Sequence, residues 1–380
     1  MQSKRTHWKI TWAALLGAGT LFAAGADQPA DPEAERLATA VEALSRLQDV
    51  NLQEKPAIKA AVLRVLEKTR GTANFVKLVQ QFKLTDQNPG LLEVAQKEPA
   101  GEAGVAAMRL ILAAKDFPLL KSALAGTNAP AAAKTAEALG HAGDKQAVPL
   151  LEPLVTEAAR DAVVRKQAVR ALAQTQEGAT ALLALARADK LPDNLKYTAS
   201  SELNAARWPA IKTEAAKLLP APAAQGTETL PPVTELLKMK GDAANGAKIF
   251  TRETTACSKC HQVRGQGVDF GPALTEIGTK LGKDALIESI LDPSAGISFG
   301  YEAWQIDLKS GDEAFGLIAS ETVDELAVKA QGGIITRYKK SDIAKREQQK
   351  LSIMPSGLQQ TVTTQEFADL IEFLSSLKKP

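Results

Sequence analysis

The sequence has few of the residues from which disulfide frameworks and zinc sites are built. It holds two cysteines and three histidines, so at most one disulfide can form. A structural zinc site needs four ligands, and beyond the first residues only His141 is available besides His261 and the cysteines, so carboxylates would have to complete it. The formal net charge is only +2, which gives no overall field of the kind that attracts nucleic acid. We therefore expect no nucleic-acid partner.

Residues 1–26 have the pattern of a secretory signal peptide. Three basic residues, the last of them Lys9, precede an apolar run from Ile10 to Ala24, and Ala24-Gly25-Ala26 offers small residues for cleavage. The run is short for a bilayer span, so a permanent anchor is the weaker alternative. We expect a periplasmic protein with no stable membrane span after the signal is removed.

Residues 31–220 are rich in Ala, Leu, Glu and Lys, contain few aromatic residues, and are interrupted about every dozen residues by Gly, Pro or Asn. This composition predicts helices. Leu139, Leu172 and Leu203 end three similar segments at separations of 33 and 31 residues. A period of this length is typical of a stacked helical solenoid, and the segment resembles HEAT-like repeats. An irregular helical bundle is the alternative.

The segment 221–233 is rich in proline and is predicted to be a linker to a second unit, residues 234–380. A chain of 380 residues with 45% hydrophobic residues is long enough for two cores. In the second unit, Asp242 begins a short helix, and the pattern of the last helix starts with a capping box at Thr363 and Glu366.

Between residues 301 and about 345 the apolar residues alternate with polar ones. Ile306 and Leu308, and then Leu326 and Val328, are two residues apart, as in strands with one buried face. Turn residues lie between these runs, at Ser310-Gly311-Asp312 and at Gly332-Gly333. This segment is predicted to be a small antiparallel β insertion within a mainly helical unit.

The only two cysteines lie in "CSKCHQVRGQGVDFGPAL", residues 257–274. Cys257-x-x-Cys260-His261 is the pattern by which haem c is attached, with a thioether bond from each cysteine and with the imidazole as an iron ligand. A redox dithiol is less favoured, because such pairs usually follow a strand in a βαβ setting. A structural disulfide is a further alternative, but it gives His261 no role. The motif therefore predicts one covalently attached haem c.

Residues outside the motif support a haem site. Pro272 follows Gly271 at a position from which a backbone carbonyl could accept the free imidazole N–H of His261, which would orient the ring. Gly246 and Phe250 would give their helix a close crossing with the last helix, at residues such as Leu370 and Phe373. Both helices would then bracket the motif.

Met354 is the residue that we expect on the other face of the iron. It lies in "LSIMPSGL", a loop constrained by Pro355 and Gly357 directly before the last helix, and Met/His ligation raises the reduction potential of haem iron. The alternatives are Met108, Met239, His141, an open position or a lysine ligand.

The segment 242–379 resembles class I cytochrome c, and more closely a cytochrome c-like haem-binding domain family found in planctomycetes and verrucomicrobia. The shared features are "NGAKIF", the motif segment, "ESILDPSAGISFGYEAW", "IMPSGL" and "EFADLIEFLSSL". The resemblance implies a cytochrome c core in which the β insertion separates the haem-attachment half from the methionine loop. The predicted fold is mainly α, with a HEAT-like solenoid followed by this domain.

We expect an electron carrier and not an enzyme, because no general acid, base or nucleophile constellation stands out and six-coordinate iron leaves no position for substrate. The expected partners are a redox protein and a protein bound by the helical repeats. Basic residues near the motif could form a docking patch for an acidic partner: Lys259, Arg264, Lys280 and Lys283. The alternatives are a haem enzyme or sensor with a labile sixth ligand, and a helical scaffold that carries a haem domain.

Overall fold

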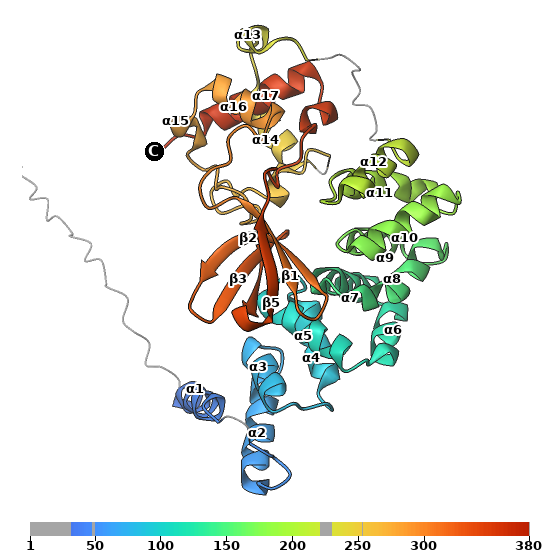
Figure 1. Cartoon of the computed structure of the whole chain (residues 1–380), viewed down its shortest axis with the longest axis vertical. Coiled ribbons are helices and arrows are strands. Elements are labelled where there is room, and N and C mark those ends of the chain that lie inside the picture. The colour runs from blue at the N-terminus through green and yellow to red at the C-terminus, as the bar shows by residue number, and fades with distance from the viewer. Residues whose placement is uncertain (1–31, 48–49, 221–229, 253, 380) are drawn as a thin grey trace, which may run out of the picture.

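A computed structural model describes residues 32–47, 50–220, 230–252 and 254–379. The predicted signal peptide and most of the predicted linker lie outside these residues. The described chain is mainly helical, with one small antiparallel sheet near the C-terminal end (Figure 1). This architecture agrees with the predicted fold class.

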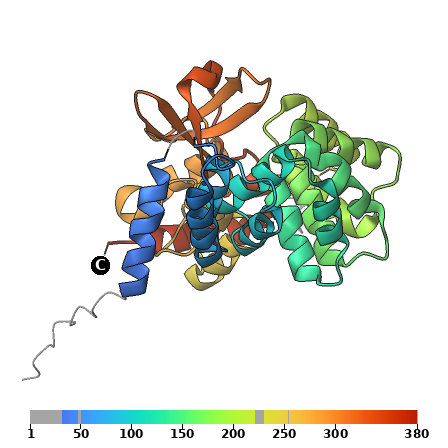
Figure 2. The ribbon, with the colours of Figure 1, turned by 90° about the horizontal axis from the view of Figure 1, so that it is seen from below.

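The N-terminal region, residues 32–220, is a succession of short helices, and we call it the solenoid. Seen from below, its helices follow one another along an arc from blue to yellow-green (Figure 2). The helices are α1 (Pro32–Ser45), α2 (Pro56–Thr69), α3 (Ala73–Gln81), α4 (Asn88–Lys97), α5 (Glu102–Ala113), α6 (Phe117–Ala125), α7 (Ala129–Ala142), α8 (Val148–Thr156), α9 (Ala162–Leu172), α10 (Gln176–Arg187), α11 (Asp193–Asn204) and α12 (Pro209–Leu218).

One continuous hydrophobic core runs through the solenoid, from Leu44 to Leu219. Leu139, Leu172 and Leu203, the residues that define the sequence period, are all buried, on α7, α9 and α11. Helices α5, α7, α9 and α11 pack in this order, which makes them one layer of the stack. The three leucines that define the sequence period therefore occupy equivalent buried positions on alternate helices.

The C-terminal region has its own core, made of two helices that cross closely. These are α14 (Ala243–Thr251) and α17 (Thr364–Ser376). A Cβ placed on Gly246 would lie 2.1 Å from the Asp369 carbonyl oxygen, so only glycine allows this approach. The rings of Phe250 and Phe373 pack with centroids 5.6 Å apart. The predicted crossing is confirmed.

The predicted starts of these two helices are also confirmed. The Asp242 side chain accepts hydrogen bonds from the first turn of α14, and Thr363 and Glu366 form the predicted capping box at the start of α17. The remaining helices of this region are α13 (Val233–Leu236), α15 (Ile277–Lys280) and α16 (Lys283–Leu291), and short 3-10 turns cover Cys257–Lys259 and Leu358–Thr361.

The β insertion is a five-stranded antiparallel sheet with the order β4-β3-β2-β1-β5. Its small core contains Ile306, Leu326 and Val328, as their alternation predicts. The alternation does not predict β5, which carries the sheet to Gln348, past residue 345, where the sequence pattern ends. The strands are β1 (Ala303–Leu308), β2 (Glu313–Glu321), β3 (Glu325–Ala330), β4 (Ile334–Lys339) and β5 (Ile343–Gln348).

The two segments that enter and leave the sheet lie side by side. The Gln349 backbone N–H donates to the Ala303 carbonyl at 2.8 Å. Further from the sheet, the Ser352 N–H donates to Ser294 Oγ at 3.1 Å. The sheet therefore begins and ends at one point of the helical region, directly before the loop that contains Met354.

Candidate haem-binding site

The two cysteines and the histidine of the motif lie on one tight turn. Ala256, with φ of 54°, redirects the chain after α14, and residues Cys257–Lys259 form a single 3-10 turn. The His261 N–H donates to the Cys257 carbonyl at 2.9 Å, and the Cys260 N–H donates to the same oxygen at 3.1 Å. Both thiols and the imidazole are thus presented together by a few residues of backbone.

The glycine-rich segment after the motif folds back over this turn. The Val268 N–H donates to the Ser258 carbonyl at 2.9 Å, and the Gly271 N–H donates to the Cys260 carbonyl at 2.6 Å. A Cβ on Gly271 would lie 2.7 Å from Cε1 of His261. The imidazole therefore packs directly against the backbone of Gly271, and a side chain there would displace the ring.

The orientation of His261 is set by Pro272, as the sequence predicts. Nδ1 of His261 lies 2.8 Å from the Pro272 carbonyl oxygen. A carbonyl only accepts, so Nδ1 carries the proton and the Nε2 lone pair is left free. Burial lowers the pKa of His261, while the bond to Pro272 raises it. A neutral imidazole with a free Nε2 is the form that binds iron.

The thiols do not have the properties of a redox dithiol. Both cysteines are free and half-buried. Burial raises the pKa of Cys257 to about 11 and also raises the pKa of Cys260. Reactive CxxC pairs depend on a lowered thiol pKa, so these side chains are poor thiolate nucleophiles by themselves.

A zinc site has no set of protein ligands in the part of the chain that the structure describes. Nowhere in that part do three or more His, Cys, Asp or Glu side chains gather where they could hold a metal ion.

Several apolar side chains near the motif are only partly buried. The partly buried residues that pack against the C-terminal core include Cys257, Val263, Leu274, Ile277, Met354 and Leu358. Three buried polar atoms also lack a hydrogen-bond partner among the described residues, and these are Arg252 Nε, Thr254 Oγ1 and Gln359 Oε1. Unfinished apolar packing and unused hydrogen-bonding capacity fit a large, mostly apolar group with polar substituents, such as haem.

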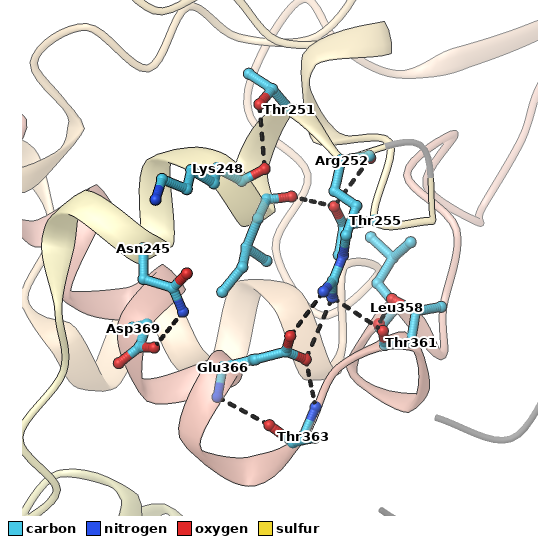
Figure 3. A network of polar contacts seen from close by, with 11 residues as sticks. Asn245, Lys248, Thr251, Arg252, Thr255, Leu358, Thr361, Thr363, Glu366 and Asp369 are labelled. Carbon is cyan, nitrogen blue, oxygen red and sulfur yellow. Dashed lines mark hydrogen bonds and ion pairs between the residues drawn. The ribbon is translucent and has the colours of Figure 1, made fainter. Parts of the chain in front are cut away.

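The loop that contains Met354 is followed by Thr361. The carbonyl of Thr361 accepts a hydrogen bond from Arg252 at the end of the helix before the motif (Figure 3). Arg252, at the end of α14, donates to both carboxylate oxygens of Glu366, at 2.7 and 3.3 Å, and to the Thr361 carbonyl at 3.2 Å. The Arg252 guanidinium and the Thr363 backbone N–H hold the pKa of Glu366 below its ordinary value, against a smaller effect of burial. The sequence gives no signal for Arg252, because its partners lie more than 100 residues further along the chain.

Two of the candidates for the second iron ligand, Met354 and Met239, pack against the C-terminal core. Met354 packs against the same core as Cys257 and is half-buried. Met108, in contrast, is fully buried in the core of the solenoid, so it is excluded as a ligand. His141 lies on α7, where it faces Gly332 of the sheet. Met239 lines a small apolar cavity with Leu236 and Phe367.

Residues 243–303 match the cytochrome c family model. The C-terminal region therefore contains a cytochrome c-like domain, a class of domain that binds haem c and transfers electrons. We use the name cytochrome c-like domain for the segment from α13 to α17, which includes the β insertion. The match contains α14, the whole motif turn and Pro272, and it ends at the first residue of β1. No curated protein matches the chain.

Proposed function

We propose that the protein is a periplasmic c-type cytochrome that transfers single electrons. The observation that carries this proposal is the motif turn, in which His261 donates Nδ1–H to Pro272 and keeps Nε2 free beside two free thiols. Cys257 and Cys260 would each add S–H across a vinyl group, with sulfur bound to one carbon and hydrogen to the other. When bound, haem would supply an iron that alternates between Fe(II) and Fe(III).

His261 would hold one face of the iron and Met354 the other. The Met354 loop is supported at both ends, by Ser294 through Ser352 and by Arg252 through Thr361, which suits a ligand that must stay in place during electron transfer. With His261 and Met354 both holding the iron, no position would remain for a substrate. We therefore assign electron transfer and no group chemistry of its own.

The periplasmic assignment is supported by the signal-like pattern of residues 1–26 and by the extracytoplasmic setting typical of cytochrome c domains. Within the described residues, no helix combines the length and apolar character needed to cross a membrane. The solenoid would serve as the docking module, since stacked helical repeats present extended surfaces to partners.

The covalent haem is tested by an absorption spectrum in alkaline pyridine of the matured full-length protein. We expect the haem c spectrum, and its loss when Cys257→Ser and Cys260→Ser are combined. A colourless wild-type protein would contradict the proposal.

The sixth ligand is tested on the oxidised protein by the far-red charge-transfer band between methionine and iron. Met354→Ala should abolish this band, whereas the matched change Met239→Ala should keep it. A high-spin wild-type spectrum that changes immediately with cyanide or carbon monoxide would instead support the sensor or enzyme alternative.

A further inference from the structure

The β insertion and the motif turn both contact the solenoid. In Figure 1 the sheet lies beside α5 and α7, and the helices of the cytochrome c-like domain lie beyond it. In Figure 2 the sheet stands on one side of the row of solenoid helices. The contacts come from α5, α7, α11 and the turn after α11. They therefore fall on the layer of alternate helices that carries the sequence period.

Arg207, after α11, makes a largely buried contact with the sheet. Its guanidinium lies between two rings, 4.8 Å from the centroid of Trp208 and 4.9 Å from that of Phe315 in β2. It also lies 3.6 Å from the Glu313 carboxylate and 3.5 Å from Gln305 Oε1. Only 23% of the Arg207 side chain is exposed. A cation buried in this way is costly unless its partners stay in place, so the solenoid and the sheet must keep this register.

A second contact is made at β4. Arg109 of α5 donates to Thr336 Oγ1 at 3.2 Å, and Glu102 of the same helix lies 3.5 Å from Arg337. The Arg109 Nε–H also donates to the Ala142 carbonyl at 2.9 Å, which joins α5 to α7 at this point. The solenoid thus presents a cation and an anion from one helix to neighbouring residues of one strand.

The turn between β3 and β4 contacts both the solenoid and the segment after the motif. A Cβ on Gly332 would lie 3.3 Å from Cε1 of His141, whereas a Cβ on Gly333 would lie 3.1 Å from the Asp269 carbonyl. The Lys329 ammonium lies 3.0 Å from the Asp269 carboxylate. The sheet is therefore packed between α7 and the loop that covers His261.

A fourth contact reaches the motif itself. Lys259, the residue directly before Cys260, has its ammonium 3.9 Å from the carboxylate of Glu202 on α11. Glu202 is 15% exposed, and Arg170 of α9 lies 3.9 Å from it. Lys259 is one of the four basic residues that the sequence suggested as a docking patch for an acidic partner. A second one, Lys283, is paired with Glu372 within its own domain at 2.5 Å.

We propose that this layer of the solenoid is the binding surface for the chain's own cytochrome c-like domain, and that Glu202 is the acidic partner of Lys259. The solenoid supplies cations to the sheet at Arg109 and Arg207 and an anion at Glu102, and it supplies the anion Glu202 to the motif turn. Alternating signs of this kind select one partner in one register and disfavour others. An external redox protein must then approach the haem from a side other than that of Lys259.

The first experiment tests the surface without reference to haem. A protease site is placed within residues 221–229 of the full-length chain, the folded protein is cut, and the fragments are examined by gel filtration at physiological salt. We expect the two fragments to elute together, and to separate when Arg207→Glu is combined with Glu202→Lys. The control is Arg187→Glu, because Arg187 pairs with Glu214 inside the solenoid. Separation of the cut wild-type protein, or no separation of the double variant, would overturn the proposal.

The second experiment tests the effect on the haem and rests on the proposed function. A carboxylate near the attachment turn stabilises the oxidised iron, so Glu202→Gln should raise the reduction potential, whereas Glu214→Gln should leave it unchanged. The haem c content is measured on the same samples. A protein without haem c contradicts the proposed function, and a fully loaded Glu202→Gln protein with the wild-type potential overturns this part of the inference.

Discussion

The solenoid and the cytochrome c-like domain use their apolar residues differently. In the solenoid, large side chains such as Phe75, Met108 and Ile111 are fully enclosed by neighbouring helices. The cytochrome c-like domain also encloses some large side chains, such as Phe367 and Ile287, but others remain partly exposed. Next to the motif, Leu274 and Ile277 are only partly buried.

This difference separates a core that is complete by itself from one that is built around another group. Helices that stack on equivalent helices bury their apolar faces in protein alone. A domain that leaves apolar residues half covered loses part of the free energy that burial would provide, at about 25 cal/mol for each Å². We infer that the second core becomes complete only when haem is bound.

The largest expected effect follows from preventing haem attachment with Cys257→Ser and Cys260→Ser. The cytochrome c-like domain should lose more than about 4 kcal/mol of unfolding free energy, comparable to the loss of a ligand held at a thousand times its dissociation constant. The solenoid should stay folded. Thermal unfolding followed by circular dichroism would show one transition lowered and one kept. A single unchanged transition would contradict the difference between the two cores.

The next effect concerns the helix crossing of the second core. Gly246→Ala should destabilise the cytochrome c-like domain by about 3 kcal/mol, because the added methyl group meets the backbone of Asp369 and the side chain of Phe373. Gly296→Ala is the matched control, since an added Cβ there has no atom within 4 Å. Urea unfolding of both variants measures the difference, and equal midpoints would show that the crossing can relax.

The solenoid has its own sensitive position, at His141 beside the sheet. Burial lowers the pKa of His141 to about 4, whereas an unfolded histidine has its ordinary pKa of 6.5. The unfolded chain therefore takes up the proton first as the pH falls, and folding stability should decrease between pH 6.5 and pH 4. At pH 5 the loss should be at most about 2 kcal/mol, because one pKa unit corresponds to about 1.4 kcal/mol.

Glu137 lies 3.9 Å from His141 and offsets part of this loss when the ring is protonated. Burial raises the pKa of Glu137, whereas it lowers the pKa of His141. Both changes favour the neutral forms of the pair. His141→Gln should flatten the dependence of stability on pH over this range, measured by urea unfolding at several pH values. A slope that survives the substitution would assign the effect to other groups.

The smallest expected effect is the loss of unfolding free energy when one ion pair is removed from each region. Arg252→Gln should cost about 1.5 kcal/mol, because partly buried hydrogen bonds to Glu366 and Thr361 are lost together. Arg46→Gln removes an exposed pair with Glu42 within α1 and should cost less than about 0.5 kcal/mol. Chemical denaturation measures both. Similar losses in the two variants would show that Arg252 does not hold the Met354 loop.

The parts of the molecule that were predictable from sequence are those fixed by neighbouring residues. The motif turn, the capping box at Thr363 and the helix-crossing role of Gly246 each depend on spacing or on one residue type. Strand β5 has no such pattern, because its residues from Ala344 onward are all exposed and three of them are charged, as suits the edge of a sheet. It is recognised only by its pairing with β1.

The contacts of Arg252 and Lys259 were not predictable for a different reason. Each depends on a partner from a distant part of the chain, Glu366 in one case and Glu202 in the other. A charged residue in a loop has the same appearance in the sequence whether it is solvated or paired. The charges near the motif could therefore be identified, but not their partners.

The hydrogen bond between Gln349 and Ala303 has a consequence for how much this chain can vary in length. The whole sheet leaves the helical region and returns to it at that one bond. Strands can be lengthened, shortened or replaced there without altering the distance that the chain has to span. A short tight turn joining residues 303 and 349 would leave both ends of the helical part where they are, and it would remove the contacts that the sheet makes with the solenoid.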